Sequence, residues 1–368
     1  MLKKGILLFI LALMLLSSSC NQSSKPIHTS SPNVSTAPTQ NIRQQPSYIT
    51  AESVIRKLAS KEFKGRLLGT EENKKAAQYI SDTFTTIGLE KYSKESYMFS
   101  YTQEDSFDWL KNSKETSSSV TVESRIKDGT NAQHIIGVIP GKDHSKAIVL
   151  TAHFDHIGTD EDGNVFCGAL DNASGIGVLI DIAQIMKART DSLSQDIVIC
   201  ALNGEEEGLQ AAGVLAEDLK TKYKSLYNID FDCIGVQGDN NIIFAGDTTV
   251  SGKLIDEMKK QFIKTGIQST VWDSNGMEYF EKEYSVQDGK MVGRAFTNSL
   301  AFSKKGISSV TLIQNIIHEY PYIKDLLAKT DPKPYLIHSI SDTEDKIDFK
   351  YIEKVSDVVC SFISGNAG

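Results

Sequence analysis

Apolar and polar positions alternate along the chain in blocks that predict strands and helices. Two continuous apolar runs, Ala147-Ile148-Val149-Leu150 and Ile197 to Leu202, are typical of strands buried on both faces of a sheet. Helical periodicity marks Glu71 to Ile87, Gly175 to Ala188 and Ile347 to Ile363. Strands that alternate with helices predict an α/β fold, here a three-layer α/β/α sandwich with a mixed, mostly parallel central sheet.

Local signals set the borders of this pattern. Thr70 is expected to cap the helix that begins at Glu71. Polar stretches from about Ser93 to Gln133 and from Trp272 to Val292 predict insertions, either at the rim of a binding site or as simple surface loops. Because no repeat or internal linker indicates a second domain, residues 47–368 are expected to form a single domain.

The first 20 residues have the pattern of a lipoprotein-type signal peptide. Two lysines precede an apolar stretch from Gly5 to Leu16, which is shorter than a comfortable membrane span. Ser17-Ser18-Ser19-Cys20 resembles a bacterial lipobox, although Leu16 stands four residues before the cysteine where an aliphatic residue usually stands three before it. We expect lipidation of Cys20; the alternative is a plain signal peptide that is cleaved nearby.

Residues 21–46 are rich in Ser, Thr, Pro, Asn and Gln and have almost no apolar side chains, which predicts a flexible tether. A lipid at Cys20 followed by this tether would place the folded domain outside the cytoplasm, anchored to the bacterial cell membrane. If Cys20 is not lipidated, the protein is expected to be secreted.

Composition narrows the class of protein. The chain has 368 residues, 40% of them hydrophobic and 23% charged, as in an ordinary globular protein. Its formal net charge of −8 argues against nucleic acid as a partner. Beyond Cys20 there are four cysteines without metal-knuckle spacing, and they are expected to be buried free thiols: Cys167, Cys200, Cys233 and Cys360.

Acidic and histidine residues recur in five short segments, most of them at or just after the end of a predicted strand. The segments are Ala152-His153-Phe154-Asp155, Gly168 to Gly175, Asn203 to Leu209, Asp230 to Gly235 and His338 to Thr343. Strand ends are where open α/β sheets bind ligands. An acidic run such as Glu205-Glu206-Glu207 is by itself usually solvated surface. Charges placed directly after buried strands, however, must be paired or bind metal if they are buried too.

These residue types suit metal-dependent hydrolysis. Imidazole and carboxylate groups are the usual ligands of hydrolytic zinc, and two ions about 3.5 to 4 Å apart hold a water and polarise a carbonyl together. The adjacent Glu205 and Glu206 allow one carboxylate to bind metal while the other moves a proton. The pattern therefore indicates a metal-dependent hydrolase.

From about Gly65 to Asp348 the sequence resembles the co-catalytic dizinc aminopeptidases of the aminopeptidase S and aminopeptidase Y type. The specific part is an ordered set of motifs: His-x-Asp, Gly-Ala-x-Asp-Asn-Ala-Ser-Gly, Glu-Glu-x-Gly-Leu, Asp-x-x-Gly and a late His. Gly65 to Thr70 and Ile136 to Gly141 resemble the family as well, but as fold markers without chemistry. With its lipobox, the chain resembles a bacterial lipoprotein member of this family with a zinc exopeptidase-like fold.

The resemblance implies a role for each motif residue. Asp171 would bridge two Zn²⁺ ions, with cobalt or manganese as possible substitutes. The remaining ligands would be His153 and Asp232 for one ion and Glu206 and His338 for the other. Glu205 would be the general base, and Asp155 would orient the liganding imidazole. Asp230 competes with Asp232, but only Asp232 has the family's glycine three residues later. A cis peptide bond between Asp171 and Asn172 is also implied.

The sequence departs from the family pattern in three places. Thr297-Asn298-Ser299 stands where the family often has Ser-Asp-His. Ile337 stands where some members have a transition-state tyrosine, and the tyrosines that can substitute are Tyr320, Tyr322 and Tyr335. His156 and His318 match nothing in the family and are expected to be packing or surface histidines.

The expected function is hydrolysis of N-terminal residues from peptides, with peptide substrates and a membrane surface as partners. Two alternatives remain: a single-zinc enzyme like glutaminyl cyclase, and a metal-free receptor-like binding domain. The complete ligand set argues against the second, and no Gly-x-Ser-x-Gly elbow supports a serine hydrolase. Side-chain preference, the native metal and the oligomeric state are left open.

Overall fold

The computed structural model describes residues 42–93, 95–103, 129–207, 210–273, 285–287, 290–292, 297–314 and 336–365. All of them belong to the unit Ala37–Gly368. Cys20 with its predicted lipid, the three tyrosines of the predicted transition-state group and His318 lie outside the described residues.

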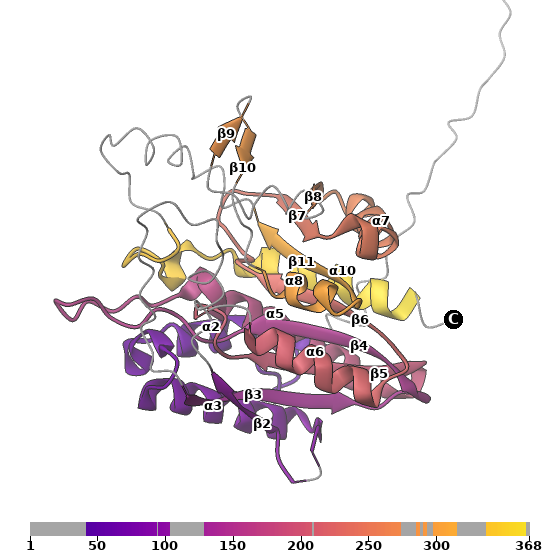
Figure 1. The fold of residues 1–368 in the computed structure, drawn as a ribbon, viewed down its shortest axis with the longest axis horizontal. Coiled ribbons are helices and arrows are strands. Elements are labelled where there is room, and N and C mark those ends of the chain that lie inside the picture. Colours follow the sequence, from indigo (N-terminus) through magenta and orange to yellow (C-terminus); the bar gives the residue numbers. More distant parts are fainter. Residues whose placement is uncertain are drawn as a thin grey trace, which may run out of the picture. The chain divides into compact units, whose positions relative to one another are not determined.

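A central nine-stranded sheet forms the middle layer (Figure 1). Its strands are β1 (Glu90–Lys91), β2 (Met98–Gln103), β3 (Thr130–Ile139), β4 (Asp143–His153), β5 (Gln195–Leu202), β6 (Ser225–Asp232), β7 (Asn241–Gly246), β8 (Gln268–Asp273) and β11 (Ser308–Gln314). The order is β1-β3-β5-β4-β6-β11-β7-β8, with β2 paired to β3. The central strands β5, β4, β6 and β11 run parallel, while β3 joins β5 and β7 joins β11 antiparallel. A separate hairpin consists of β9 (Ser285–Gln287) and β10 (Lys290–Val292).

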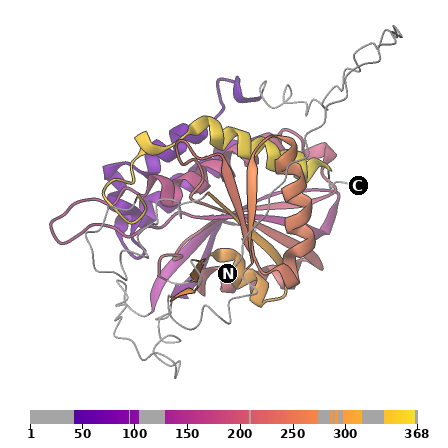
Figure 2. The ribbon, with the colours of Figure 1, turned by 90° about the horizontal axis from the view of Figure 1, so that it is seen from above.

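Helices cover both faces of the sheet (Figures 1 and 2). They are α2 (Ala51–Leu58), α3 (Glu71–Ile87), α5 (Ser174–Lys187), α6 (Gln210–Lys222), α7 (Thr248–Lys264), α8 (Asn298–Lys304) and α10 (Phe349–Gly365), with short turns η1 (Lys61–Arg66), η2 (Ala169–Ala173), η3 (Thr190–Ser192) and η6 (Glu344–Lys346). Side chains of β4 alternate between the two cores: Ile148 and Leu150 pack with α5, and Val149 packs with α6 and α8. The predicted three-layer α/β/α sandwich with a mixed sheet is confirmed.

The helix predictions agree with the structure to within a few residues. Helix α3 begins at Glu71, and the Thr70 hydroxyl oxygen accepts a hydrogen bond from the Asn73 amide, as a cap does. Helix α5 begins one residue before the predicted Gly175, and α10 begins at Phe349, two residues after the predicted start.

The prediction of polar insertions is wrong in part. Strand β2 and the beginning of β3 fall within the first predicted insertion, and β8 overlaps the start of the second. Burial alternates along the end of β2, where Tyr101 and Gln103 are buried and Thr102 is exposed. Strands of this kind lie at the sheet margin and need apolar residues on one face only, so their composition is polar.

The folded domain begins before residue 47. Arg43, inside the predicted tether, donates to both carboxylate oxygens of Asp181 at 3.1 and 2.6 Å and lies 2.9 Å from Asp357 Oδ1. The Asp181 side chain is 1% exposed, so this ion pair fixes residues just after Asn41 against α5 and α10. The described part of the chain contains no helix long and apolar enough to cross a membrane. All four cysteines after Cys20 are free and buried, as predicted.

Candidate metal centre

Three parallel strands bring the predicted residues to one edge of the sheet. β5, β4 and β6 are neighbours in that order, and His153 on β4 pairs with Leu202 on β5. His153 is the last residue of β4 and Asp232 the last of β6, while Glu205 and Glu206 follow the end of β5. Because the carboxyl ends of parallel strands meet at the same edge, side chains distant in sequence converge there.

The turn η2 holds Asp171 over this edge. The peptide bond between Asp171 and Asn172 is cis, as the family resemblance implied. The Asn172 side chain donates to the carbonyl of Phe231 at 2.8 Å and accepts from the Gly175 and Cys233 amides at 2.9 and 3.3 Å. One amide side chain thus fastens the Asp171 turn both to the start of α5 and to the end of β6.

Asp342 fastens the other side of the same turn. Its buried carboxylate accepts hydrogen bonds from the backbone amides of Leu170 at 2.7 Å and Asp171 at 3.1 Å. Burial raises the pKa of Asp342 to about 6, and these amide hydrogen bonds work in the opposite direction. Asp342 lies four residues after His338, so it links the His338 segment to Asp171.

Arg66 ties together the backbone beneath these loops. Its fully buried guanidinium donates to the carbonyls of Leu58, Phe154, Cys167 and Gly168 at 2.6 to 2.9 Å. Two of these carbonyls belong to the loop before η2, and Phe154 follows His153. The neighbouring Gly65 has a φ of +69°, and a Cβ there would lie 2.3 Å from the Gly158 carbonyl oxygen, so only glycine fits.

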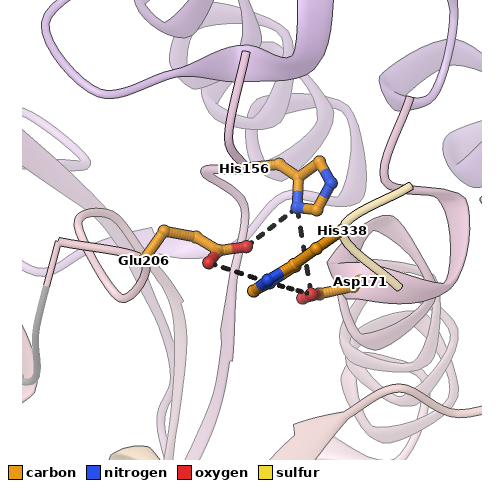
Figure 3. A group of neighbouring side chains, drawn as sticks. All are labelled: His156, Asp171, Glu206 and His338. Carbon is orange, nitrogen blue, oxygen red and sulfur yellow. Dashed lines mark hydrogen bonds and ion pairs between the residues drawn. The ribbon is translucent and has the colours of Figure 1, made fainter. Parts of the chain in front are cut away.

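The converging side chains form two groups of donor atoms. In the first, His153 Nε2 lies 3.3 Å from Asp171 Oδ1 and 3.6 Å from Asp232 Oδ1. In the second, His338 Nε2 lies 3.0 Å from Asp171 Oδ2 and 3.1 Å from Glu206 Oε2 (Figure 3). Asp171 belongs to both groups and presents a different oxygen to each.

His156 joins the second group, contrary to its interpretation as a packing or surface histidine. Its Nδ1 lies 2.8 Å from Glu206 Oε1 and 3.9 Å from Asp171 Oδ2. Its side chain is fully buried. The available signal was position: His156 lies three residues after His153, in the same loop after β4. The family pattern has no counterpart for it, which is why the comparison of motifs missed it.

Asp155 supports the centre through the backbone. Its carboxylate oxygens accept from the amides of Glu205 at 3.2 Å and Glu206 at 3.1 Å. His153 Nδ1 lies 3.2 Å from the backbone oxygen of Asp155 and 3.7 Å from its carboxylate. Asp155 therefore faces the imidazole and also holds the loop that carries both glutamates.

Asp230, the rival of Asp232, belongs to neither group. Its buried carboxylate accepts from Thr151 at 2.6 Å, Thr311 at 3.0 Å and the Asn298 amide at 3.3 Å. Burial raises the pKa of Asp230 to about 7. Asn298, which stands in the segment that departs from the family pattern, thus packs behind β6 against Asp230.

The centre carries an excess of buried acid. Burial raises the pKa of Glu205 well above its usual range, and Glu206, Asp232 and Asp171 add to the effect while His153 opposes it. Burial opposes charge on the His153 ring, whereas the His338 side chain is half exposed, and the surrounding carboxylates raise the pKa of both rings well above the usual value. Clustered buried carboxylates of this kind require positive charge nearby.

Both groups have the donor chemistry of zinc. Imidazole nitrogen and carboxylate oxygen bind Zn²⁺ at about 2.0 to 2.2 Å, which places donors of a tetrahedral ion roughly 3.3 Å apart. The separations of 3.3 and 3.6 Å in the first group and of 3.0 and 3.1 Å around His338 agree with this spacing. The residues present therefore fit two ions that share Asp171.

Comparison with known proteins points to the same chemistry. The model of peptidase family M28 matches residues 134–363. A probable zinc metalloprotease from Leptosphaeria maculans is 31% identical over 115 residues, which cover 30% of this chain and 26% of that protein. The chain thus spans about a quarter of the length of this curated relative.

Solved structures share the fold. A zinc aminopeptidase from Bacillus subtilis superposes with a TM-score of 0.60 at 16% identity over 85% of this chain and 93% of that chain. A glutaminyl cyclase from Bacteroides thetaiotaomicron superposes with a TM-score of 0.59 at 17% identity over 86% and 97% of the two chains. At these identities the similarity shows the fold and does not separate the two activities.

Proposed function

Because the chain belongs to peptidase family M28, a family of zinc metallopeptidases, we propose that it is an aminopeptidase that works with two zinc ions. His153, Asp171 and Asp232 would hold one ion, and Asp171, Glu206 and His338 the other. The observation that carries the proposal is the division of Asp171, whose Oδ1 faces His153 and whose Oδ2 faces His338. Cobalt or manganese can occupy the same donors.

Bound ions would lower the pKa of a water at the centre towards neutrality and polarise the carbonyl of the scissile peptide. Glu205 is the proton carrier in this proposal, because its neighbour Glu206 is engaged by His338 and His156. Glu205 would take a proton from the attacking water and return it to the leaving amine. Burial and the nearby carboxylates of Glu206, Asp232 and Asp171 raise the pKa of Glu205, which supports this role.

Asp155 and Asp342 would act by positioning. Asp155 fixes the amides of both glutamates, and Asp342 fixes the amide of Asp171. Both carboxylates bond to backbone amides of these residues, so the side-chain donor atoms of Asp171 and Glu206 would stay free to face the ions. The free α-amine of a peptide would lie beside the acidic groups, which favours cleavage at the N-terminus.

The experiment is metal analysis of the purified protein combined with a panel of amino-acid anilides and an N-terminal glutaminyl peptide. The proposal predicts two equivalents of metal and anilide hydrolysis. One equivalent with release of ammonia from the glutaminyl peptide would instead identify a cyclase. Protein that binds no metal and is inert on both substrates would indicate a receptor-like domain.

The proposed enzyme acts outside the cytoplasm, attached to the cell membrane through a lipid on Cys20. The support is the signal-peptide pattern and the polar segment that follows it. Arg43 marks the point at which that segment meets the folded domain.

A further inference from the structure

We propose that His156 is a metal ligand, so that the second donor group holds its ion with two imidazoles and two carboxylates. The inference rests on the proposed metal-dependent function and adds a ligand that the motif pattern does not contain. The group then consists of His156, His338, Glu206 and Asp171.

The His156 ring points towards the carboxylates of the second donor group. In Figure 3 its Nδ1 and the Nε2 of His338 both point into the space between Glu206 and Asp171. The separations of His156 Nδ1 from Glu206 Oε1 and Asp171 Oδ2, 2.8 and 3.9 Å, lie on either side of the roughly 3.3 Å expected between donors of a tetrahedral ion.

Among the described residues, the polar contacts of the buried His156 ring are all made by one of its two nitrogens. His156 is fully buried, and its Nε2 has no hydrogen-bond partner among the described residues. Its polar contacts are therefore those of Nδ1 with the carboxylates. A buried imidazole that is bonded through one nitrogen alone is costly unless that bonding is strong, and bonding to a cation is stronger than a neutral hydrogen bond.

The backbone also holds the ring in this direction. Gly168 has a φ of +59°, and a Cβ at that position would lie 2.6 Å from the His156 ring. The glycine thus lets the loop before η2 pack directly against the imidazole. Because that loop is fastened by Arg66, the ring and the Asp171 turn share one support.

A fourth protein donor makes the two ions unequal. Four protein ligands are typical of closed zinc sites, whereas three leave a position open for water or substrate. The group around His156 would therefore bind its ion more tightly, and the open position would belong to the group of His153, Asp171 and Asp232.

The test is competition between the metal-free protein and a chromophoric zinc chelator, which yields a dissociation constant for each ion. Two variants are compared, His156→Asn and His156→Asp, whose new side chains have nearly the same size as each other. Asparagine can replace Nδ1–H as a hydrogen-bond donor to Glu206 but is a poor zinc ligand, whereas aspartate can bind zinc but repels Glu206. His153→Asn is the matched control in the other group.

We expect His156→Asn to weaken one zinc constant about 10- to 100-fold or more and to leave the other within about threefold. His338→Asn should weaken the same constant, His153→Asn the other one, and His156→Asp should bind more tightly than His156→Asn. With cobalt, the visible spectrum of the affected ion should change in His156→Asn. Circular dichroism of the metal-free variants is the control that tests whether each is folded.

Unchanged constants in His156→Asn would overturn the inference and leave His156 as a hydrogen-bond donor to Glu206. The same holds if His156→Asn binds as tightly as wild type while His156→Asp binds more weakly. A wild type that binds one ion would overturn the two-ion function instead. In that case the effect of His156→Asn on the single constant still decides the role of His156.

Discussion

Glu205 and Glu206 are neighbours in sequence but face different surroundings. Glu206 lies 2.8 Å from His156 and 3.1 Å from His338, as a metal ligand requires. Burial beside other carboxylates raises the pKa of Glu205, as a proton carrier near neutral pH requires. At the scale of single residues, this difference separates the proposed metal ligand from the proposed base.

Glu205→Gln should lower kcat by about 10² to 10⁴-fold, because the amide cannot accept the proton of the attacking water. Metal content should stay near that of wild type, since the variant keeps every donor of the two groups. The measurement is steady-state kinetics together with metal analysis. Glu206→Ala is the control and should lose metal. Equal loss of metal in the two variants would contradict the assignment.

Asp342→Asn tests the support of the Asp171 turn. One amide oxygen cannot accept from both the Leu170 and Asp171 amides in the same way, so one buried N–H loses its partner. We expect the metal-free protein to lose about 1 to 3 kcal/mol of unfolding free energy and the metal affinity to fall about 10- to 100-fold.

Urea unfolding and metal titration measure the two effects of Asp342→Asn. Ser341→Ala is the control, because Ser341 is exposed beside Asp342. A metal affinity and a stability equal to those of wild type would show that the two amide hydrogen bonds do not hold the turn.

Some residues of the site could be located from the sequence and others could not, and the reason is physical. The motifs located the side chains that converge in the two groups, because strand ends and residue types are visible in sequence. The positioning role of Asp342 could not be read from the sequence. It depends on hydrogen bonds to backbone amides that lie 171 and 172 positions away in the chain. His156 was missed because a lone histidine carries no indication of its direction.

At the scale of elements, β3 and the loop after β5 are joined by one neutral histidine. His134 accepts from the Asn203 amide through Nδ1, and its Nε2 contacts the Ala211 carbonyl oxygen at 3.1 Å. Its ring stacks on Tyr101, with centroids 4.7 Å apart. Asn203 begins the loop that leads to Glu205, so this ring supports the position of the segment that carries the proposed base.

Acid should destabilise this junction. Burial lowers the pKa of His134 from 6.5 to about 4, so between these values the unfolded chain binds a proton that the folded chain does not. The contribution of His134 to the free energy of unfolding is complete above pH 6.5. It falls as the pH decreases towards 4 and is constant below that value. The loss amounts to about 3 kcal/mol at most.

The measurement is the free energy of unfolding of metal-free wild type and of His134→Gln, from about pH 8 to about pH 4. The neutral ring predominates at roughly the upper limit, and in the unfolded chain the charged ring predominates at roughly the lower limit. The difference between the two proteins should shrink as the pH falls, because only wild type loses the contribution of His134. A difference that stays constant with pH would show that the ring remains neutral in both states.

Strands with continuous apolar runs were predicted well, whereas strands near the margin of the sheet were not. The stretches 147–150 of β4 and 197–202 of β5 are buried on both faces, so these stretches are apolar throughout. β2 (MFSYTQ) and β8 (QSTVWD) have two and four exposed residues, and polar residues interrupt their apolar ones, so neither has a continuous apolar run. Their place in the sheet comes from pairing with β3 and β7, which is a long-range contact that local pattern does not contain.

At the scale of the whole molecule, the proposed lipid on Cys20 decides where the enzyme works. Two acyl chains on one cysteine would anchor the protein stably, and the tether would span about 5 to 6 Å times the square root of its length. Wild type should partition into detergent with the membrane fraction, whereas Cys20→Ala should not be acylated. Cell fractionation with mass spectrometry of the N-terminal peptide measures this. If both proteins are unmodified and equally soluble, the anchor is absent and the peptidase proposal stands.

The central claim is that residues from His153 to His338 form one centre for two ions joined by Asp171. The most direct measurement is the zinc content per chain of saturated protein, freed of unbound metal, for wild type and Asp232→Asn. The account predicts two equivalents in wild type and one in Asp232→Asn, because Asp232 faces only the His153 group. A single equivalent in wild type that Asp232→Asn leaves unchanged would contradict it.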